Sequence, residues 1–503
     1  MFQVATVPEY GLNSNLLILF LSESFVKKRK KDFSAFPPCV VSDLEYFFSN
    51  FKDFKGELKQ THLIYPAGNS SVQRILLVGL GDEEKLSAQD FRELGYTLQG
   101  VQEKLNTRRN HIYLGNLLVC HNALIENLSE GIFFKQYVFD RYKSEKKQKE
   151  KEKKARYIYV CSKDNYSPRF RQAFLKTQKV MNAVYVTRNL ANLPSNDATP
   201  EDIKNFVQKH FAQFARCSVE VLERKELETL GMGALLGVAQ GSVHPPFLVI
   251  IRYQPSNPNG KRIALVGKGV TFDSGGISIK PSANMEEMKY DMAGAAAVIG
   301  GMDYVAHALP KSEVIGVIPL VENMPSGSAM KPGDIVKSYS GKTIEVINTD
   351  AEGRLILADA LAYANQRFKP NVIIDFATLT GAMMVALGDK RAGLFSNSEN
   401  LKNVLIKAGD ESGDLLWPMP LDDIYQKDLE SSVADLKNIG SRWGGAITAA
   451  KFLQNFIGKT NWAHIDMAGL ANDIKHIDYW GKGATGFGPR LIAAAVKGLQ
   501  RTV

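Results

Sequence analysis

The chain has 503 residues, of which 45% are hydrophobic and 23% are charged, and its formal net charge is +9. This length is too great for one small hydrophobic core, so we expect two or more domains. No apolar run reaches the roughly 18–20 residues that a membrane span requires. The N-terminal segment lacks the pattern of a secretory signal, and the four cysteines include no CxxC pair. These features argue against a membrane or secreted protein and predict a cytoplasmic one with reduced thiols.

Strand and helix patterns alternate in the first 140 or so residues. Residues 15–21 and 74–81 have the composition of buried strands. The sequence SAQD at 87–90 is a capping-box pattern, which predicts a helix that reaches about Lys104. This part of the chain is therefore expected to form a small α/β domain.

A strongly basic run follows this part. Residues 141–156 hold nine Lys or Arg and three Glu, which accounts for +6 of the net charge of +9. A run of mixed sign is most often a solvated helix or loop, and we interpret it as an exposed segment. A phosphate-binding arm is the alternative, because clustered Lys and Arg neutralise nucleic-acid phosphates. Nucleic-acid binding is therefore kept as a secondary hypothesis.

The rest of the chain continues the α/β alternation. Helical periodicity over 170–194, ended by Pro194, predicts a linker helix, and Pro200 predicts the start of another helix. Strands are expected at 261–269, 313–321, 342–350, 371–379, 391–397 and 461–469, and helices at 292–309, 355–368 and 488–500. This order predicts a larger α/β domain with a central mixed sheet covered by helices. Ligand sites in such folds lie beyond the carboxyl ends of the strands.

Acidic and basic residues gather in two stretches near the ends of predicted strands. These stretches, 267–294 and 348–355, contain the candidate functional residues Lys268, Asp273, Lys280, Asp291, Asp350, Glu352 and Arg354. Several carboxylates within ~4–6 Å of one another cannot all stay ionised without compensating cations. A pair of divalent ions ~3.5–4 Å apart is one solution, and such a pair can activate a water molecule. The eight histidines are scattered with no HExxH motif, so any metal site would consist mainly of oxygen ligands.

Each of these residues also has an ordinary structural explanation. Asp350 or Glu352 would be favoured at a helix N-terminus by the helix dipole, and Asp273 in DSGG is typical of a turn. Lys268, directly after a strand, would usually be a solvated residue at the sheet edge. A dinuclear-metal phosphoesterase would fit the carboxylates but normally uses more histidine ligands. From spacing alone, the dinuclear site is one hypothesis among these.

The chain resembles the leucyl aminopeptidase (cytosol aminopeptidase) family. NTDAEGRL at 348–355 is identical to the signature octamer of that family, and 266–298 looks like its other metal-binding segment. Residues 187–200 and 375–382 also match, so the resemblance is strong over most of 170–503 and weak over 1–140.

The resemblance implies a domain organisation and an assembly. A macro-like N-terminal α/β domain would occupy 1–165, a linker helix 166–194 and a catalytic domain 195–503. The implied protein is a homohexamer that removes leucine-like N-terminal residues, with broad specificity, from peptides with a free N-terminus.

The resemblance also implies a role for each matched residue. The tighter metal site would use Asp273, Asp350 and Glu352, and the more exchangeable one would use Lys268, Asp273, Asp291 and Glu352. The ions would be Mn²⁺ or Zn²⁺, although Mg²⁺ and Co²⁺ also suit these ligands.

Two further residues would act on the substrate. Lys280 would polarise the scissile carbonyl, and Arg354 would hold a bicarbonate ion that acts as the general base. Met288, Thr378 and Gly381 would line the pocket for the first substrate side chain.

Overall fold

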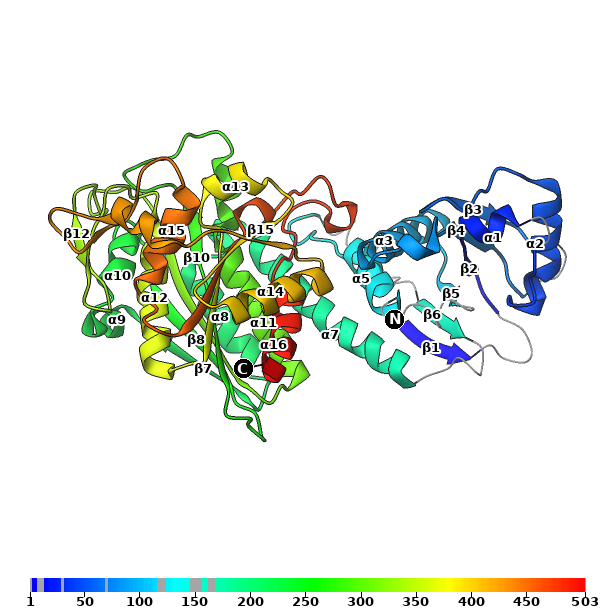
Figure 1. Cartoon of the computed structure of the whole chain (residues 1–503), viewed down its shortest axis with the longest axis horizontal. Helices are drawn as coiled ribbons and strands as arrows, with labels where there is room; N and C mark the ends of the chain where they lie inside the picture. The colour runs from blue at the N-terminus through cyan, green and yellow to red at the C-terminus, as the bar shows by residue number, and fades with distance from the viewer. Residues whose placement is uncertain are drawn as a thin grey trace. The chain divides into compact units, whose positions relative to one another are not determined.

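The computed structural model describes residues 2–6, 13–28, 31–67, 71–114, 124–144, 156–161 and 168–502. The chain divides into two compact units, residues 1–178 and 179–503, which Figure 1 shows in blue to cyan and in cyan to red. The division falls within helix α7 (Pro168–Ala191), in the segment for which the sequence predicts a linker helix. Most of the basic run, residues 145–155, lies outside the described residues.

The N-terminal unit contains a mostly parallel sheet. Its strand order is β1 (Phe2–Thr6), β6 (Arg156–Cys161), β5 (Arg109–Tyr113), β2 (Leu16–Leu21), β4 (Ile75–Gly79) and β3 (Thr61–Ile64). Only the β3–β4 pair is antiparallel within this described sheet. The predicted strands at 15–21 and 74–81 are confirmed as β2 and β4.

Helices cover both faces of this sheet. Helix α2 (Pro38–Asn50) packs Val40, Leu44 and Phe47 against β2 and β4, beside the short helix α1 (Glu23–Lys27). Helices α3 (Ala88–Leu105) and α5 (Leu124–Gln136) pack on the opposite face, where the Tyr157 hydroxyl donates to Gln99 of α3 at 2.7 Å. The predicted capping box of α3 is confirmed, because Ser87 and Asp90 each accept the backbone N–H of the other.

The larger unit contains a mixed sheet. Its strand order is β16 (Leu416–Pro418), β15 (Ala392–Ser396), β18 (Asn461–Asp466), β14 (Val372–Ala377), β9 (Arg262–Gly267), β11 (Glu313–Asn323), β8 (Phe247–Tyr253) and β7 (Cys217–Leu222), with β10 (Gly269–Asp273) beside the end of β11. The central strands β18, β14, β9 and β11 run parallel, so their carboxyl ends meet at one edge. Strands β15, β8 and β7 add antiparallel pairs on the two sides.

Two helical layers enclose the larger sheet. One face is covered by α8 (Pro200–Phe211), α11 (Ala293–Ala308), α14 (Glu399–Ser412) and α16 (Pro489–Thr502) (Figure 1). The other is covered by α10 (Gly233–Ala239), α12 (Glu352–Phe368) and α15 (Gly445–Gln454), with α9 (Arg224–Leu230) at the side of β7 and β8. Helix α12 is buried nearly all round over most of its length, because it lies between the sheet and its neighbours α10 and α15. No helix in the described ranges is long and apolar enough to cross a membrane.

Two sequence predictions about strands were wrong. The strand predicted over 342–350 is only β13 (Thr343–Glu345), in a small sheet with β12 (Ile335–Lys337) and β17 (Leu436–Lys437). The chain leaves that sheet because the Asn438 side chain accepts the backbone N–H groups of Ile347 and Asn348. The strand predicted over 261–269 ends as β9 at Gly267, and a separate strand that was not predicted, β10, pairs with the last residues of the eleven-residue β11.

Candidate metal centre

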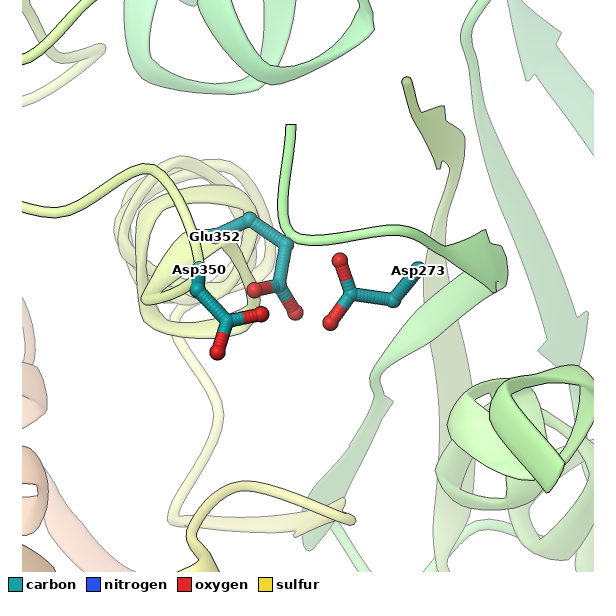
Figure 2. Close-up of side chains that lie close together, drawn as sticks. All are labelled: Asp273, Asp350 and Glu352. Carbon is teal, nitrogen blue, oxygen red and sulfur yellow. The ribbon is translucent and has the colours of Figure 1, made fainter. Parts of the chain in front are cut away.

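Three carboxylates converge at the carboxyl edge of the larger sheet. Asp273 ends β10, Asp350 lies in the loop that follows β13, and Glu352 is the first residue of α12. One oxygen of each lies within 4.8 Å of the others, and Figure 2 shows the three side chains directed toward a common space. Asp273 and Glu352 are buried, whereas the Asp350 side chain is 32% exposed. Two stretches about 80 residues apart are thus brought together, as the sequence predicts.

Two lysines lie between these acids. The Lys280 Nζ is 2.7 Å from Asp273 Oδ2 and also pairs with Asp350. The Lys268 Nζ is 2.7 Å from Asp291 Oδ1 and 2.9 Å from Glu352 Oε1. When all the groups are ionised, four carboxylates share two ammonium groups, so the cluster has two more negative than positive charges.

Burial dominates the protonation of the acids. It raises the pKa of Asp273 to about 7, with a further contribution from the charge of Glu352, and the two lysines oppose the rise. Burial also raises the pKa of Asp291 and of Asp350. Burial acts on Glu352 in the same direction, but Lys268 and Lys280 outweigh it and lower the pKa of this residue. Three of the four acids therefore tend to take up protons because their own lysines do not fully compensate their charge, and added cations would keep them ionised.

The donor set fits divalent metal ions. The Asp291 Oδ2 is buried and has no hydrogen-bond partner among the described residues, and the neighbouring donors are carboxylate oxygens. Hard divalent cations prefer such oxygens, and one lysine nitrogen also admits Zn²⁺ or Co²⁺. Burial acts to lower the pKa of Lys268, yet the charges of Asp291, Glu352 and Asp273 outweigh it and raise this pKa. As a metal ligand Lys268 would therefore release a proton on binding.

Arg354 lies in the first turn of α12 and is buried. Its Nη1 donates to the Asn438 carbonyl at 2.8 Å, and its Nε has no partner among the residues described. Burial lowers the pKa of Arg354 to about 10, against the opposing charges of Glu352 and Asp466. Such a guanidinium can hold a small anion with a charge-assisted hydrogen bond.

The three predicted pocket residues lie near the centre in sequence or in space. Thr378 contacts it directly, because its hydroxyl donates to Asp291 Oδ1 at 2.8 Å and its carbonyl accepts from Lys268 Nζ at 2.8 Å. Met288 is half-buried in the 3₁₀ helix η5 (Met285–Met292). Gly381 is exposed at the start of α13 (Gly381–Leu387).

Two asparagines that sequence reasoning missed hold the acid-bearing segments. Asn323, the last residue of β11, donates from Nδ2 to Asp273 Oδ1 at 2.8 Å and to the Thr349 carbonyl at 3.1 Å. Asn438 donates from Nδ2 to the Asn348 carbonyl at 2.7 Å. A polar residue at the end of an apolar strand could have pointed to Asn323. Asn438 lies about 90 residues from its partners, and no local pattern marks it.

The fold and the site together define a two-domain α/β protein with a carboxylate-rich centre suited to divalent metal ions. The sequence pattern of the cytosol aminopeptidase family, catalytic domain, matches residues 185–493, and that of its N-terminal domain matches residues 49–146. A probable cytosol aminopeptidase of Brucella melitensis biotype 1 is 47% identical over 453 residues, covering 89% of this chain and 92% of the relative. One of Geobacter sp. (strain M21) is 43% identical over 448 residues, covering 88% and 89%.

A solved structure shares the fold over nearly the whole chain. The bottromycin maturation enzyme BotP in complex with Mn is similar with a TM-score of 0.81 and 28% identity, covering 97% of this chain and 99% of that one. The chain therefore belongs to the cytosol aminopeptidase family. The protein is a metal-dependent hydrolase that removes N-terminal residues from peptides, that is, a metalloexopeptidase. The resemblance and the two-domain α/β fold predicted from the sequence are confirmed, and the phosphoesterase alternative is not.

Proposed function

We propose that this aminopeptidase works with a dinuclear centre built from the acids of Figure 2 and the Lys268–Asp291 pair. The tighter site would use Asp273, Asp350 and Glu352, and the more exchangeable site would use Lys268, Asp273, Asp291 and Glu352. The observation that carries this proposal is the convergence of three carboxylate oxygens within 4.8 Å of one another, in a centre where four carboxylates share two lysines. A shared Asp273 and Glu352 would explain why both are buried between the two lysines.

Lys280 is proposed as the residue that polarises the scissile carbonyl. When bound, a pair of divalent ions supplies Lewis acidity and lowers the pKa of a water molecule toward about 7. The Lys280 side chain is 21% exposed, so its ammonium can reach a substrate oxygen as well as Asp273 and Asp350. Negative charge that develops on the carbonyl oxygen would be stabilised by this ammonium, and removing such a donor typically costs roughly 10²–10³ in rate.

Arg354 is proposed to hold a bicarbonate ion, which would supply the general base. The unpartnered Nε supports this role, because Nη1 is already committed to the Asn438 carbonyl. Arg354→Ala should then lose the activity that added bicarbonate stimulates in the wild-type protein, while its metal content stays unchanged.

The proposed substrates are peptides with a free N-terminus and a leucine-like first residue, accepted with broad specificity. Met288, Thr378 and Gly381 are proposed to line the pocket for that side chain. The contact of Thr378 with both Lys268 and Asp291 supports a pocket next to the second metal site.

The metal and the assembly are proposed from relatives. The family resemblance gives Mn²⁺ or Zn²⁺, and the solved relative in complex with Mn supports Mn²⁺. The resemblance also implies a homohexamer, and a measurement of the molar mass in solution would test it. A cytoplasmic location agrees with the names of the relatives, and the domain limits 1–165, 166–194 and 195–503 are retained as a proposal.

The direct test is hydrolysis of leucine p-nitroanilide before and after chelation. We expect chelation to abolish turnover and Mn²⁺ or Zn²⁺ to restore it, with elemental analysis of the same samples showing two ions per chain. Activity that persists in the metal-free protein would contradict the proposal.

Nucleic-acid binding would be a separate role, favoured only by the charge of residues 141–156. A mobility assay across a salt series would test it, because binding driven by phosphates weakens steeply as salt rises. A chain in which 145–155 is replaced by a neutral linker is the matched control.

A further inference from the structure

A three-residue segment, Thr378–Thr380, connects β14 to α13 and contacts the proposed second metal site. The Thr378 carbonyl accepts from Lys268 Nζ, and its hydroxyl donates to Asp291 Oδ1, both at 2.8 Å. The same hydroxyl lies 3.3 Å from the Asp291 carbonyl. The relative position of Lys268 and Asp291 therefore depends on where this segment lies.

One buried carboxylate holds the two residues that follow Thr378. Asp466 ends β18, the neighbour of β14, and is fully buried. Its Oδ2 accepts from the Thr380 hydroxyl at 2.7 Å, and its Oδ1 accepts from the Leu379 N–H at 3.2 Å. Oδ1 also accepts from the Ala468 N–H at 3.2 Å, which ties the carboxylate to its own strand end.

The surroundings of Asp466 keep this carboxylate in one position. The Met467 N–H donates to the Ala377 carbonyl at 2.8 Å, so the ends of β14 and β18 are joined next to it. His464 lies two residues earlier on the same face of β18, and its Nδ1 is 2.6 Å from Asp375 Oδ1. The Trp462 indole donates to the other oxygen of Asp375 at 2.7 Å. These bonds hold β18 against β14 beside Asp466, because breaking any of them would leave a buried polar group unsatisfied.

We propose that Asp466 is a positioning residue, which fixes the Thr378–Thr380 segment so that Thr378 orients Lys268 and Asp291 for the second metal ion. This inference rests on the proposed dinuclear centre. Partners of metal ligands typically change metal affinity by about 10–100-fold when they are removed. Asp466 is hydrogen-bonded to Leu379 and Thr380 and to no proposed metal ligand among the described residues, so its effect on the second metal site would pass through these two residues. Its charge also opposes the lowering of the pKa of Arg354 by burial, which is why the test measures metal affinity and not activity.

The test compares Mn²⁺ binding to the metal-stripped full-length protein and its variants by chelator competition, together with the melting temperature. In Asp466→Ala we expect the weaker of the two Mn²⁺ ions to bind about 10–100-fold less tightly, with a smaller change at the tighter site. Asp466→Asn should restore most of this affinity, because its amide can accept from Leu379 and donate to a turned Thr380 hydroxyl. If Asp466→Ala does not fold, Thr380→Val provides the same test in a milder form.

Asp414→Ala is the matched control. Asp414 is also fully buried and also binds backbone N–H groups, those of Gly488 and Leu491, besides the Arg490 guanidinium. The Asp414→Ala variant should have a lower melting temperature and an unchanged Mn²⁺ affinity. Equal weakening by the Asp414 variant, or unchanged affinity in Asp466→Ala, would overturn the inference and leave the metal centre standing. A wild-type protein that binds no Mn²⁺ would contradict the centre itself and the inference with it.

Discussion

Gly353, the second residue of α12, packs against the side chain of Lys268. A Cβ added at this position would lie 2.5 Å from Lys268 Cε and 2.7 Å from its Nζ. Carbon atoms in contact prefer roughly 3.5–4.0 Å, so Gly353→Ala should displace the lysine by about 1 Å. The lysine has little freedom to move, because Asp291, Glu352 and the Thr378 carbonyl hold its Nζ at 2.7–2.9 Å.

The expected loss is in activity more than in stability. Overpacking costs about 1–3 kcal/mol, and replacing Gly by Ala within a helix returns roughly 0.5–1 kcal/mol, so the free energy of unfolding changes modestly. A misplacement of about 1 Å in a reacting site can lower the rate about 10²-fold. We therefore expect Gly353→Ala to lose about 10²-fold in kcat on leucine p-nitroanilide and to bind its weaker metal ion less tightly.

Gly100→Ala in α3 provides the control for the helical substitution itself. The nearest atom to an added Cβ there is Lys135 Cε at 3.9 Å, so this variant should keep full activity. Wild-type kcat and two tightly bound ions in Gly353→Ala would refute the reasoning, because they would show that Lys268 can move without consequence.

The remaining predictions concern Lys280 and Asp359. Lys280→Ala should lower kcat roughly 10²–10³-fold while elemental analysis still finds two ions, and an equal loss of metal would make Lys280 a structural residue instead. Burial raises the pKa of Asp359 to about 7, although its oxygens accept the N–H groups of Leu235 and Tyr339. The folded chain then holds this proton up to about pH 7, whereas the unfolded chain releases it near pH 4, so this residue makes stability fall between those values as pH rises. Asp359→Asn should be less stable overall, but its denaturant midpoint should fall less between about pH 4 and pH 7 than that of the wild-type protein. An equal fall with pH in the two proteins would contradict the assignment.

Local patterns in the sequence were sufficient for much of the fold. The Ser87–Asp90 capping box, the Pro200 helix start and the apolar strands are determined by residues a few positions apart. The octamer at 348–355 and the stretch at 267–294 predicted which acids meet. Their acids lie at the ends of elements that meet at the carboxyl edge of the larger sheet.

Long-range contacts explain the parts that the sequence did not predict. The segment after Glu345 has an apolar pattern typical of a strand, but Asn438 binds its backbone and turns it toward Asp350. Asn323 contacts the centre, and Asp466 contacts the segment beside it, from strands that only the folded sheet brings together. The partners of these side chains lie about 50 to 90 residues away, so no local pattern shows which residues they bind.

The central claim is that divalent ions neutralise the carboxylates that converge on Asp273. Elemental analysis and turnover of Asp273→Ala beside the wild-type protein test it most directly, with melting temperatures to confirm folding. The account predicts two ions per wild-type chain and the loss of both ions and activity in the variant. A folded Asp273→Ala protein with two bound ions and near-normal turnover would contradict it.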